Sequence, residues 1–196
     1  MKLVTTALLL TFAMTLDAQV TYGPKLGLNL AKATMTNKDF DSKITPKFFV
    51  GGFVNYALSE KMSLQGELLY SREGGNGKRI SNDADDKLFY DYLQLPVLFR
   101  YAVTGNLFAE AGPQFGYLLS AKEDYNDNPT VDIKEYYKKT EVRLPFGVGY
   151  KFTESSVKGL QLNLRYSFSF SEINKVEVGG EKIKLSVLSL GAAYSF

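Results

Sequence analysis

The chain contains no cysteine, no histidine and no tryptophan. Without cysteine it can form neither a disulfide framework nor a thiolate metal site. Without histidine it lacks the side chain that most often serves as a general base or metal ligand. The net charge of +2 is far from the basic surplus of nucleic-acid-binding proteins. We therefore predict no metal site, no cofactor, no catalytic residue and no nucleic-acid partner.

Long apolar runs are also scarce, and the clearest one stands at the start of the chain. Lys2 precedes an apolar segment at residues 3–16, and Ala18 offers a small residue for cleavage. This pattern predicts a secretion signal over residues 1–18. The run is shorter than the roughly 20 residues that a membrane-spanning helix needs. We expect the mature domain to comprise residues 19–196.

The mature sequence alternates apolar and polar residues. Examples are LQLNLRYSFS at residues 160–169 and SVLSLGAAYSF at residues 186–196. A side-chain period of two predicts β-strands with one apolar face. Eight such segments can be delimited, at residues 25–31, 47–56, 62–72, 88–101, 107–119, 140–152, 160–171 and 186–196.

The connections between these segments alternate in length. Short ones fall near residues 58–60, 103–106 and 153–158, and long polar ones near residues 32–46, 73–87, 121–139 and 172–182. Bacterial outer-membrane barrels have short periplasmic turns and longer extracellular loops. The predicted fold is therefore all-β: an eight-stranded antiparallel up-and-down transmembrane β-barrel, with both ends of the chain on the short-turn side.

Alternation alone does not decide which face of the strands points inward. A soluble lipocalin-like barrel would place the apolar face inside. Segments of about ten residues match a tilted membrane-spanning strand. Tyr56, Tyr101 and Tyr150 stand at turn ends, where an interfacial aromatic girdle would lie. We therefore favour the membrane arrangement, with the polar face inside.

Two features interrupt the pattern. Phe49 and Phe53 share the parity of the predicted interior, which indicates a β-bulge or an aromatic plug. Pro96, Pro113 and Pro145 stand inside strand segments, where each removes a ladder donor. We expect local bulges at these prolines.

Charged residues recur on the face predicted to point inward. They are Glu67, Arg100, Glu110, Glu141, Arg143, Lys151 and Arg165. Across a tight turn at residues 103–106, Arg100 would lie diagonally opposite Glu110, within interaction range. Gly147 and Gly149 would leave room beside Arg165. The network is either a narrow ion path or a packed polar core, and an eight-stranded barrel is just wide enough for side chains to fill it.

Several segments resemble porin-family, or PorT-type, outer-membrane β-barrel domains of Bacteroidota. They include GPKLGLNLA (23–31), GGFVNYALSEKMSLQGELLYSREGG (51–75), YLQLPVLFRY (92–101), AGPQFGYLLSAK (111–122), PFGVGYKF (145–152) and LGAAYSF (190–196). The resemblance implies a small barrel similar to outer-membrane protein X or the A-type barrel, located in the outer membrane of a Gram-negative cell. It also implies contacts with outer-membrane lipid and lipopolysaccharide. Tyr194 and Phe196 would form a C-terminal signal for the barrel assembly machinery, and we expect a monomer.

Three functions remain open at this stage. The first is a structural or loop-mediated interaction barrel with a plugged polar lumen. The second is a passive channel for ions or small solutes, and the third is an accessory of a secretion system. We predict that the protein is not an enzyme, because outer-membrane barrel enzymes of known mechanism use a histidine. Tyr125, Tyr136 and Tyr137 in the third long connection would contact a partner or rest near lipid headgroups.

Overall fold

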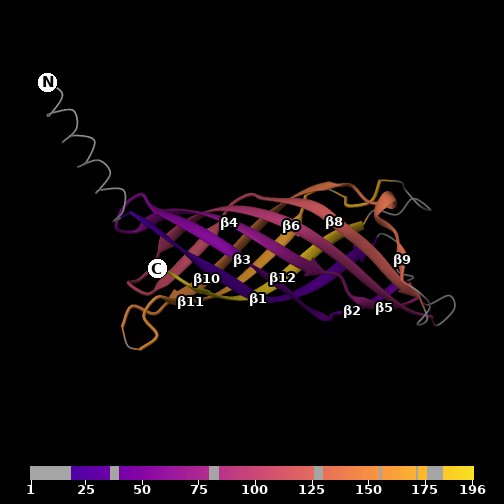
Figure 1. Ribbon diagram of the computed structural model, residues 1–196, viewed down its shortest axis with the longest axis horizontal. Helices are drawn as coiled ribbons and strands as arrows, with labels where there is room; N and C mark the ends of the chain where they lie inside the picture. Colours follow the sequence, from indigo (N-terminus) through magenta and orange to yellow (C-terminus); the bar gives the residue numbers. More distant parts are fainter. Residues whose placement is uncertain are drawn as a thin grey trace, which may run out of the picture.

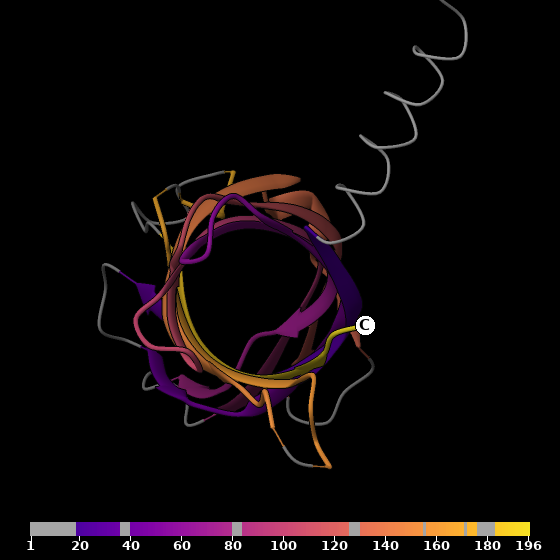
Figure 2. The same ribbon diagram turned by 90° about the vertical axis from the view of Figure 1, so that its left-hand side faces the viewer.

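Strands with a side-chain period of two pair antiparallel with their neighbours and close on themselves into a barrel, shown from the side in Figure 1 and along its axis in Figure 2. The computed structural model describes residues 19–35, 40–79, 84–125, 130–154, 156–170, 172–175 and 183–196. The expected secretion signal lies outside these residues. No helix in the described part of the chain is long and apolar enough to cross a membrane.

The barrel closes through eight antiparallel strands, as the alternation predicts. Going around the ring, β1 is followed by β3, β4, β6, then β7 together with β8, then β10, β11 and β12, which pairs with β1. The described elements are β1 (Val20–Met35), β2 (Phe40–Lys43), β3 (Pro46–Ala57), β4 (Met62–Glu73), β5 (Asn76–Arg79), β6 (Ala84–Ala102), β7 (Leu107–Ala111), β8 (Gln114–Tyr125), β9 (Val131–Asp132), the 3-10 helix η1 (Lys134–Tyr136), β10 (Thr140–Lys151), β11 (Leu160–Ser169) and β12 (Ile183–Tyr194).

Some barrel strands are interrupted and resume in the same direction. β2 extends β3 and β5 extends β4, because β2 pairs with β5 just as β3 pairs with β4. β7 and β8 together form the fifth strand that the alternation predicts at residues 107–119. Ala111 pairs with Phe99, and Gln114 pairs with Pro96, so one register continues across the interruption.

The prolines are accommodated without bulges, so our expectation of local bulges is wrong. Pro145 lies within an unbroken register between β10 and β11. The pairs on both sides of Pro96 keep one register with β4, as do those flanking Pro113 with β10. A register shift lies instead between Asp91 and Tyr92, where β8 contributes one extra residue.

The apolar face of the strands points outward. Leu26, Leu164 and Leu190 are 59%, 47% and 57% exposed, whereas Lys25 and Arg165 are 1% and 5% exposed. This is the arrangement of a membrane barrel, in which the apolar face contacts lipid. It is the opposite of a lipocalin-like soluble barrel.

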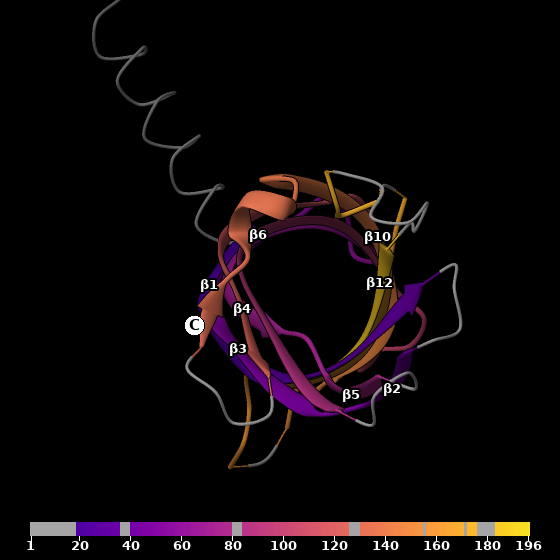
Figure 3. The same cartoon turned by 90° about the vertical axis from the view of Figure 1, so that its right-hand side faces the viewer.

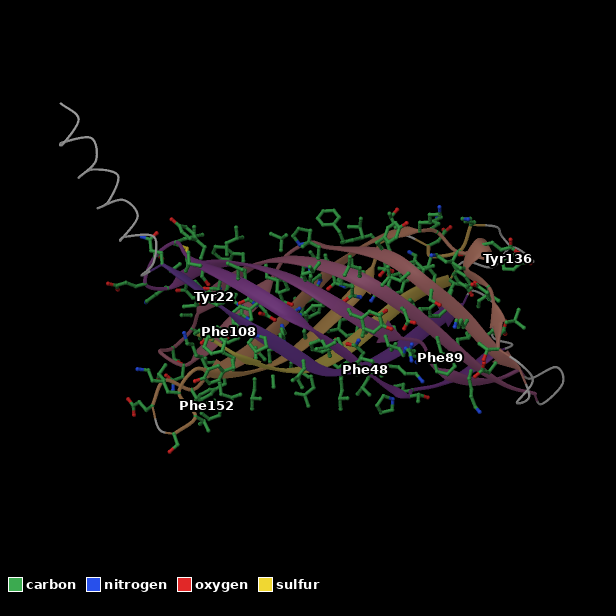
Figure 4. All side chains as sticks on the ribbon, viewed as in Figure 1. Tyr22, Phe48, Phe89, Phe108, Tyr136 and Phe152 are labelled. Atoms are coloured by element: carbon green, nitrogen blue, oxygen red, sulfur yellow. The ribbon has the colours of Figure 1, made fainter. Side chains whose placement is uncertain are left out.

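The two ends of the barrel differ in structure. The turns at residues 58–61, 103–106, 152–154 and 156–159 lie at one end together with the C-terminal residue, on the left of Figure 1. We call this the short-turn end; Tyr22 and Phe152 are labelled there in Figure 4. The opposite end, the long-loop end, faces the viewer in Figure 3. The connections predicted at residues 73–87 and 121–139 are longer than the observed ones, because β6 already begins at Ala84 and β8 continues to Tyr125.

Candidate functional site in the barrel interior

The interior is filled near its middle by a cluster of buried charges, the lower cluster. It consists of Lys25 on β1, Glu67 on β4, Arg100 on β6, Glu110 on β7 and Arg165 on β11. Each side chain points inward because it shares the parity of its strand's buried residues. Five different strands therefore contribute to one buried ionic network.

Arg165 joins the two carboxylates of the lower cluster. Its Nη1 donates to Glu67 Oε2 at 2.9 Å, and its Nη2 donates to Glu110 Oε1 at 2.7 Å. Lys25 Nζ donates to Glu67 Oε1 at 2.8 Å. Arg100 Nε donates to Glu110 Oε2 at 2.9 Å; the two residues pair directly across the hairpin, whereas we predicted a diagonal position. Charge-assisted bonds of this length are the strong class of hydrogen bond.

A second charged layer, the upper cluster, lies closer to the long-loop end. Arg143 donates to both oxygens of Glu73, at 2.9 and 2.7 Å, and its Nη2 lies 2.6 Å from Glu141 Oε1. Gln94 also donates to Glu73, at 2.7 Å. Both carboxylate oxygens of Glu141 are buried and accept no hydrogen bond within the described part of the chain. Such groups are costly unless water or an ion satisfies them.

The two clusters balance each other in charge. The lower cluster has three cations and two carboxylates, and the upper cluster has one cation and two carboxylates. The interior network is therefore neutral as a whole, with a surplus of one positive charge below and one negative charge above. Neutrality is what an enclosed network requires, because an unpaired buried charge is destabilising.

Above the upper cluster the interior is apolar. Its wall consists of Leu88, Tyr90, Tyr92, Leu118, Ala121 and Leu185, and three loop residues, Ile133, Tyr137 and Ile173, pack against this wall. We call these three residues the cap. Tyr90 donates a 2.9 Å hydrogen bond to the Tyr137 hydroxyl, and the two rings meet edge to face. Burial raises the pKa of the Tyr137 hydroxyl, which therefore stays protonated beyond its ordinary range.

Backbone bonds hold the cap in place. Ile133 N donates to Ala121 O at 2.9 Å, and Ile173 N donates to Ile183 O at 3.0 Å. Tyr137 also forms a β-bridge with Asn174, which ties the two loops together. Figure 3 shows η1 lying against the rim of the barrel beside this point. Tyr137 is thus an interior residue, whereas Tyr136 is 53% exposed and available for contact.

Aromatic rings occupy the remaining interior space. A Cβ at Gly149 would lie 2.2 Å from the Phe108 ring, so Phe108, labelled in Figure 4, takes the room that we expected Arg165 to use. Phe49 stands opposite Gly27, whose Cβ would lie 2.5 Å from that ring. The inward parity of Phe49 and Phe53 therefore reflects an aromatic filling, and the register there has no bulge.

Small spaces inside the barrel are lined by described residues. A vestibule of about 230 Å³ at the short-turn end is lined by residues that include Thr21, Asn55, Lys61, Arg100, Phe108 and Lys151. Between the two clusters lies a void of about 10 Å³, which suffices for about one water molecule. No group of three or more metal-ligating side chains is found among the described residues.

Six of the seven predicted interior residues belong to the two clusters. Lys151 is the exception: it lies on the vestibule wall, and its side chain forms no hydrogen bond or ion pair with any residue that the structure describes. The sequence analysis missed Lys25 and Glu73. Lys25 is the first residue of one predicted strand, and Glu73 lies one residue beyond the end of another, yet Glu73 continues the parity of Glu67 and Ser71. Extending that parity by one step would have placed Glu73 inside.

The C-terminal aromatics lie on the outside at the short-turn end. Tyr194 is 43% exposed and Phe196 is 67% exposed. The Phe196 ring lies 6.1 Å from the Tyr22 ring, and its backbone nitrogen donates to Tyr22 O at 2.9 Å. These contacts join the last residue to the first strand next to the line of closure.

Comparisons with known proteins agree with this geometry. A model of the outer membrane protein beta-barrel domain family matches residues 13–175. No curated protein sequence matches the chain. Among solved structures, neisserial surface protein A has a TM-score of 0.52 at 16% identity, covering 89% of this chain and 97% of that chain.

Two further structures are similar. Ail of Yersinia pestis, solved with the heparin analogue sucrose octasulfate, has a TM-score of 0.50 at 11% identity, covering 91% of this chain and 99% of its own. OprG of Pseudomonas aeruginosa has a TM-score of 0.51 at 10% identity, with coverages of 91% and 95%. At these identities the similarity concerns the fold alone.

Proposed function

Since this chain belongs to the outer membrane protein beta-barrel domain family, we propose that it is a plugged barrel of the outer membrane that acts as a structural element or through its long-loop end. In such barrels the long loops are extracellular and the short turns periplasmic. The single observation that supports this proposal is the filled interior. Two ionic layers and an apolar cap lie in series along the axis.

The width of the barrel supports the same proposal. The interior of an eight-stranded barrel is just wide enough to be filled by side chains. Arg143 and Arg165 each engage two carboxylates, and both are nearly fully buried. Opening a path would require both arginines to leave their partners. The cost of leaving buried charges unpaired is several kcal/mol, roughly 3–5 per broken pair.

Single-channel current across a planar lipid bilayer tests the proposal. We expect the refolded protein to give no steady current steps across voltage. A heat-dependent gel shift on the same sample verifies that the barrel is folded. Steady ion-selective steps from folded protein would overturn the proposal.

A passive channel is the second candidate, and the vestibule favours it. This 230 Å³ space reaches Arg100 of the lower cluster from the short-turn end. Solutes that enter it would therefore reach the lower cluster, and the upper cluster and the cap would still separate them from the long-loop end. If the protein is a channel, neutralising Glu110 or Arg143 should change its ion selectivity. If it is plugged, Arg165→Ala alone should leave it silent. A role as an accessory of a secretion system would leave cargo in the periplasm on deletion, and rests on the family resemblance only.

The remaining parts of the proposal concern the cell. We propose a porin-family protein of a Bacteroidota outer membrane, exported with a signal that is removed after Ala18. We further propose that Tyr194 and Phe196 are read by the barrel assembly machinery, and that outer-membrane lipid and lipopolysaccharide surround a monomer. We propose no enzymatic activity and no cofactor. N-terminal sequencing of membrane-extracted protein tests the cleavage site, because a first residue other than Gln19 would contradict it.

A further inference from the structure

Cationic side chains gather on the outside of the barrel near its long-loop end. We call them the basic rim: Lys32 on β1, Arg72 on β4, Lys122 on β8 and Lys184 on β12. The side chains of Lys32 and Lys184 are exposed, and they continue the outward parity of Leu28 and Leu190, which are 50% and 57% exposed. Lys122 is also exposed and follows the fully buried Ala121.

Lys32 and Lys184 form the centre of the basic rim. Lys32 pairs with Ser186 across the closing strands, and Lys184 pairs with Thr34, so the two lysines are diagonal neighbours on the outer face. Diagonal neighbours lie about 7–8 Å apart, within reach of one shared ligand for long side chains. Neither lysine forms a hydrogen bond or ion pair with any residue that the structure describes.

The next cations around the ring lie against aromatic rings. Lys47 Nζ lies 4.4 Å from the centre of the Phe89 ring, and the Arg72 guanidinium carbon lies 6.0 Å from the centre of the Phe48 ring. Figure 4 labels both phenylalanines. Arg72 also pairs with Asp91 at 2.7 Å. Cations above aromatic rings are typical of the boundary between hydrocarbon and headgroups.

The height of the basic rim matches the top of the apolar band. Lys184 and Tyr194 lie on the same face of β12, about ten residues apart. At about 3.3 Å per residue and a tilt of about 40°, this spacing corresponds to about 25 Å along the axis. An outer-membrane barrel has an apolar band about 25 Å tall. Because Tyr194 marks the short-turn boundary, Lys184 marks the opposite one.

The exposed turns at the short-turn end show no such surplus of positive charge among the described residues. Its exposed turn residues include Glu60 and Lys61 in one turn, and Glu154 and Lys158 in another. Each described pair is neutral, whereas Lys32, Lys122 and Lys184 have no described acidic partner. The basic rim therefore favours anionic headgroups at one membrane boundary specifically.

We propose that the basic rim binds the phosphate groups of a phosphorylated glycolipid in the outer leaflet, with Lys32 and Lys184 as its principal contacts. The acyl chains of that lipid would lie along Leu28 and Leu190, directly below the lysines on the same two strands. Lysines at a membrane surface attract anionic lipid with a strength that grows with each added charge. The inference rests on the proposed place of the barrel in lipid, and names the lipid chemistry and the residues that bind it.

Lipid binding in nanodiscs tests this assignment. The full mature protein is reconstituted in phosphatidylcholine nanodiscs with a small fraction of diphosphoryl lipid A, in EDTA to remove bridging divalent ions. Native mass spectrometry then measures the bound lipid A. The test variant is Lys32→Glu with Lys184→Glu, and the matched control is Lys61→Glu with Lys158→Glu at the short-turn end.

We expect the rim variant to bind at least about tenfold less lipid A than the wild type, because two attractive charges become repulsive. The control variant should bind like the wild type, and fully dephosphorylated lipid A should bind all three proteins equally. Equal binding of diphosphoryl lipid A to the wild type and the rim variant would overturn the proposal. So would a difference that persists with dephosphorylated lipid. The readout is independent of ion current, so a conducting barrel would refute the plugged function and leave this result intact.

Discussion

At the scale of single residues, Glu67 is the acceptor on which the lower cluster depends. It accepts hydrogen bonds from Lys25, Gln65 and Arg165. Glu67→Ala leaves Lys25 buried without a carboxylate, so we expect the free energy of unfolding to fall by about 3–5 kcal/mol. Urea titration in lipid vesicles measures it. Glu60→Ala, at an exposed turn, should change stability by less than about 0.5 kcal/mol, and equal losses in both variants would contradict the prediction.

Whether a strand residue points into the barrel or out of it follows from its odd or even position along the strand. This rule fails for residues beyond the predicted ends of a strand. The alternation predicts that Glu67 and Arg165 face the interior, because each stands within a long alternating run. The alternation does not place Lys25 or Glu73 inside, because Lys25 opens the predicted segment 25–31 and Glu73 follows the predicted segment 62–72, although β1 in fact begins at Val20. Ala121 faces inward only because the register shift near Leu119 reverses the parity of β8. The alternation of the residues that precede an inserted residue does not predict the insertion.

At the scale of elements, the cap is the part that local sequence does not specify. Its three residues come from two loops and meet only on the finished barrel wall. Their contacts depend on loop paths, and loops have no period from which to read a face. The strands beneath the cap can be predicted from the sequence. Lipid outside and a crowded polar interior require apolar and polar side chains to alternate along every strand.

The cap should open locally when its packing is weakened. Ile173 is 2% exposed, and Ile173→Ala removes packing worth about 2 kcal/mol or more. We expect native-state trypsin cleavage at Lys138 and Lys139 to accelerate at least about tenfold, while the heat-dependent gel shift stays unchanged. Val131→Ala is the control, because Val131 is 57% exposed. Unchanged cleavage in the Ile173 variant would show that the cap does not depend on this contact.

At the scale of the whole molecule, the two ionic clusters and the cap act as barriers in series. A current through such an arrangement is limited by the barrier that remains, so removing one barrier should not open the barrel. We expect Arg143→Ala and Arg165→Ala to be silent individually in planar bilayers. Together with Ile173→Ala in one folded chain, we expect them to give measurable current. Conductance in either single arginine variant would mean that one layer is the sole barrier.

The closed ring of strands is also the part of the structure that the sequence predicts best. Strand number, antiparallel order and the polar interior all follow from alternation and from turn lengths, and the structure confirms them. The interruptions between β2 and β3, β4 and β5, and β7 and β8 do not follow. The residues on both sides of each interruption largely keep the inward or outward direction that the alternation predicts. The hydrophobic pattern therefore continues across the interruptions and does not reveal them. The prolines likewise fit because the register on both sides is fixed by many other pairs.

The position of Lys25 also bears on the order in which the chain assembles. Lys25 lies on the first strand, next to the seam where β1 meets β12, and reaches Glu67 across the interior. Ser189 and Asn29, bonded across the same seam, are separated by 160 residues in the chain. Such distant contacts form late, because most of the chain must be ordered before they can be made. Until β1 and β12 pair, Glu67 and Arg165 remain accessible to water. The pairing of these two strands and the burial of the charged side chains are therefore one cooperative event.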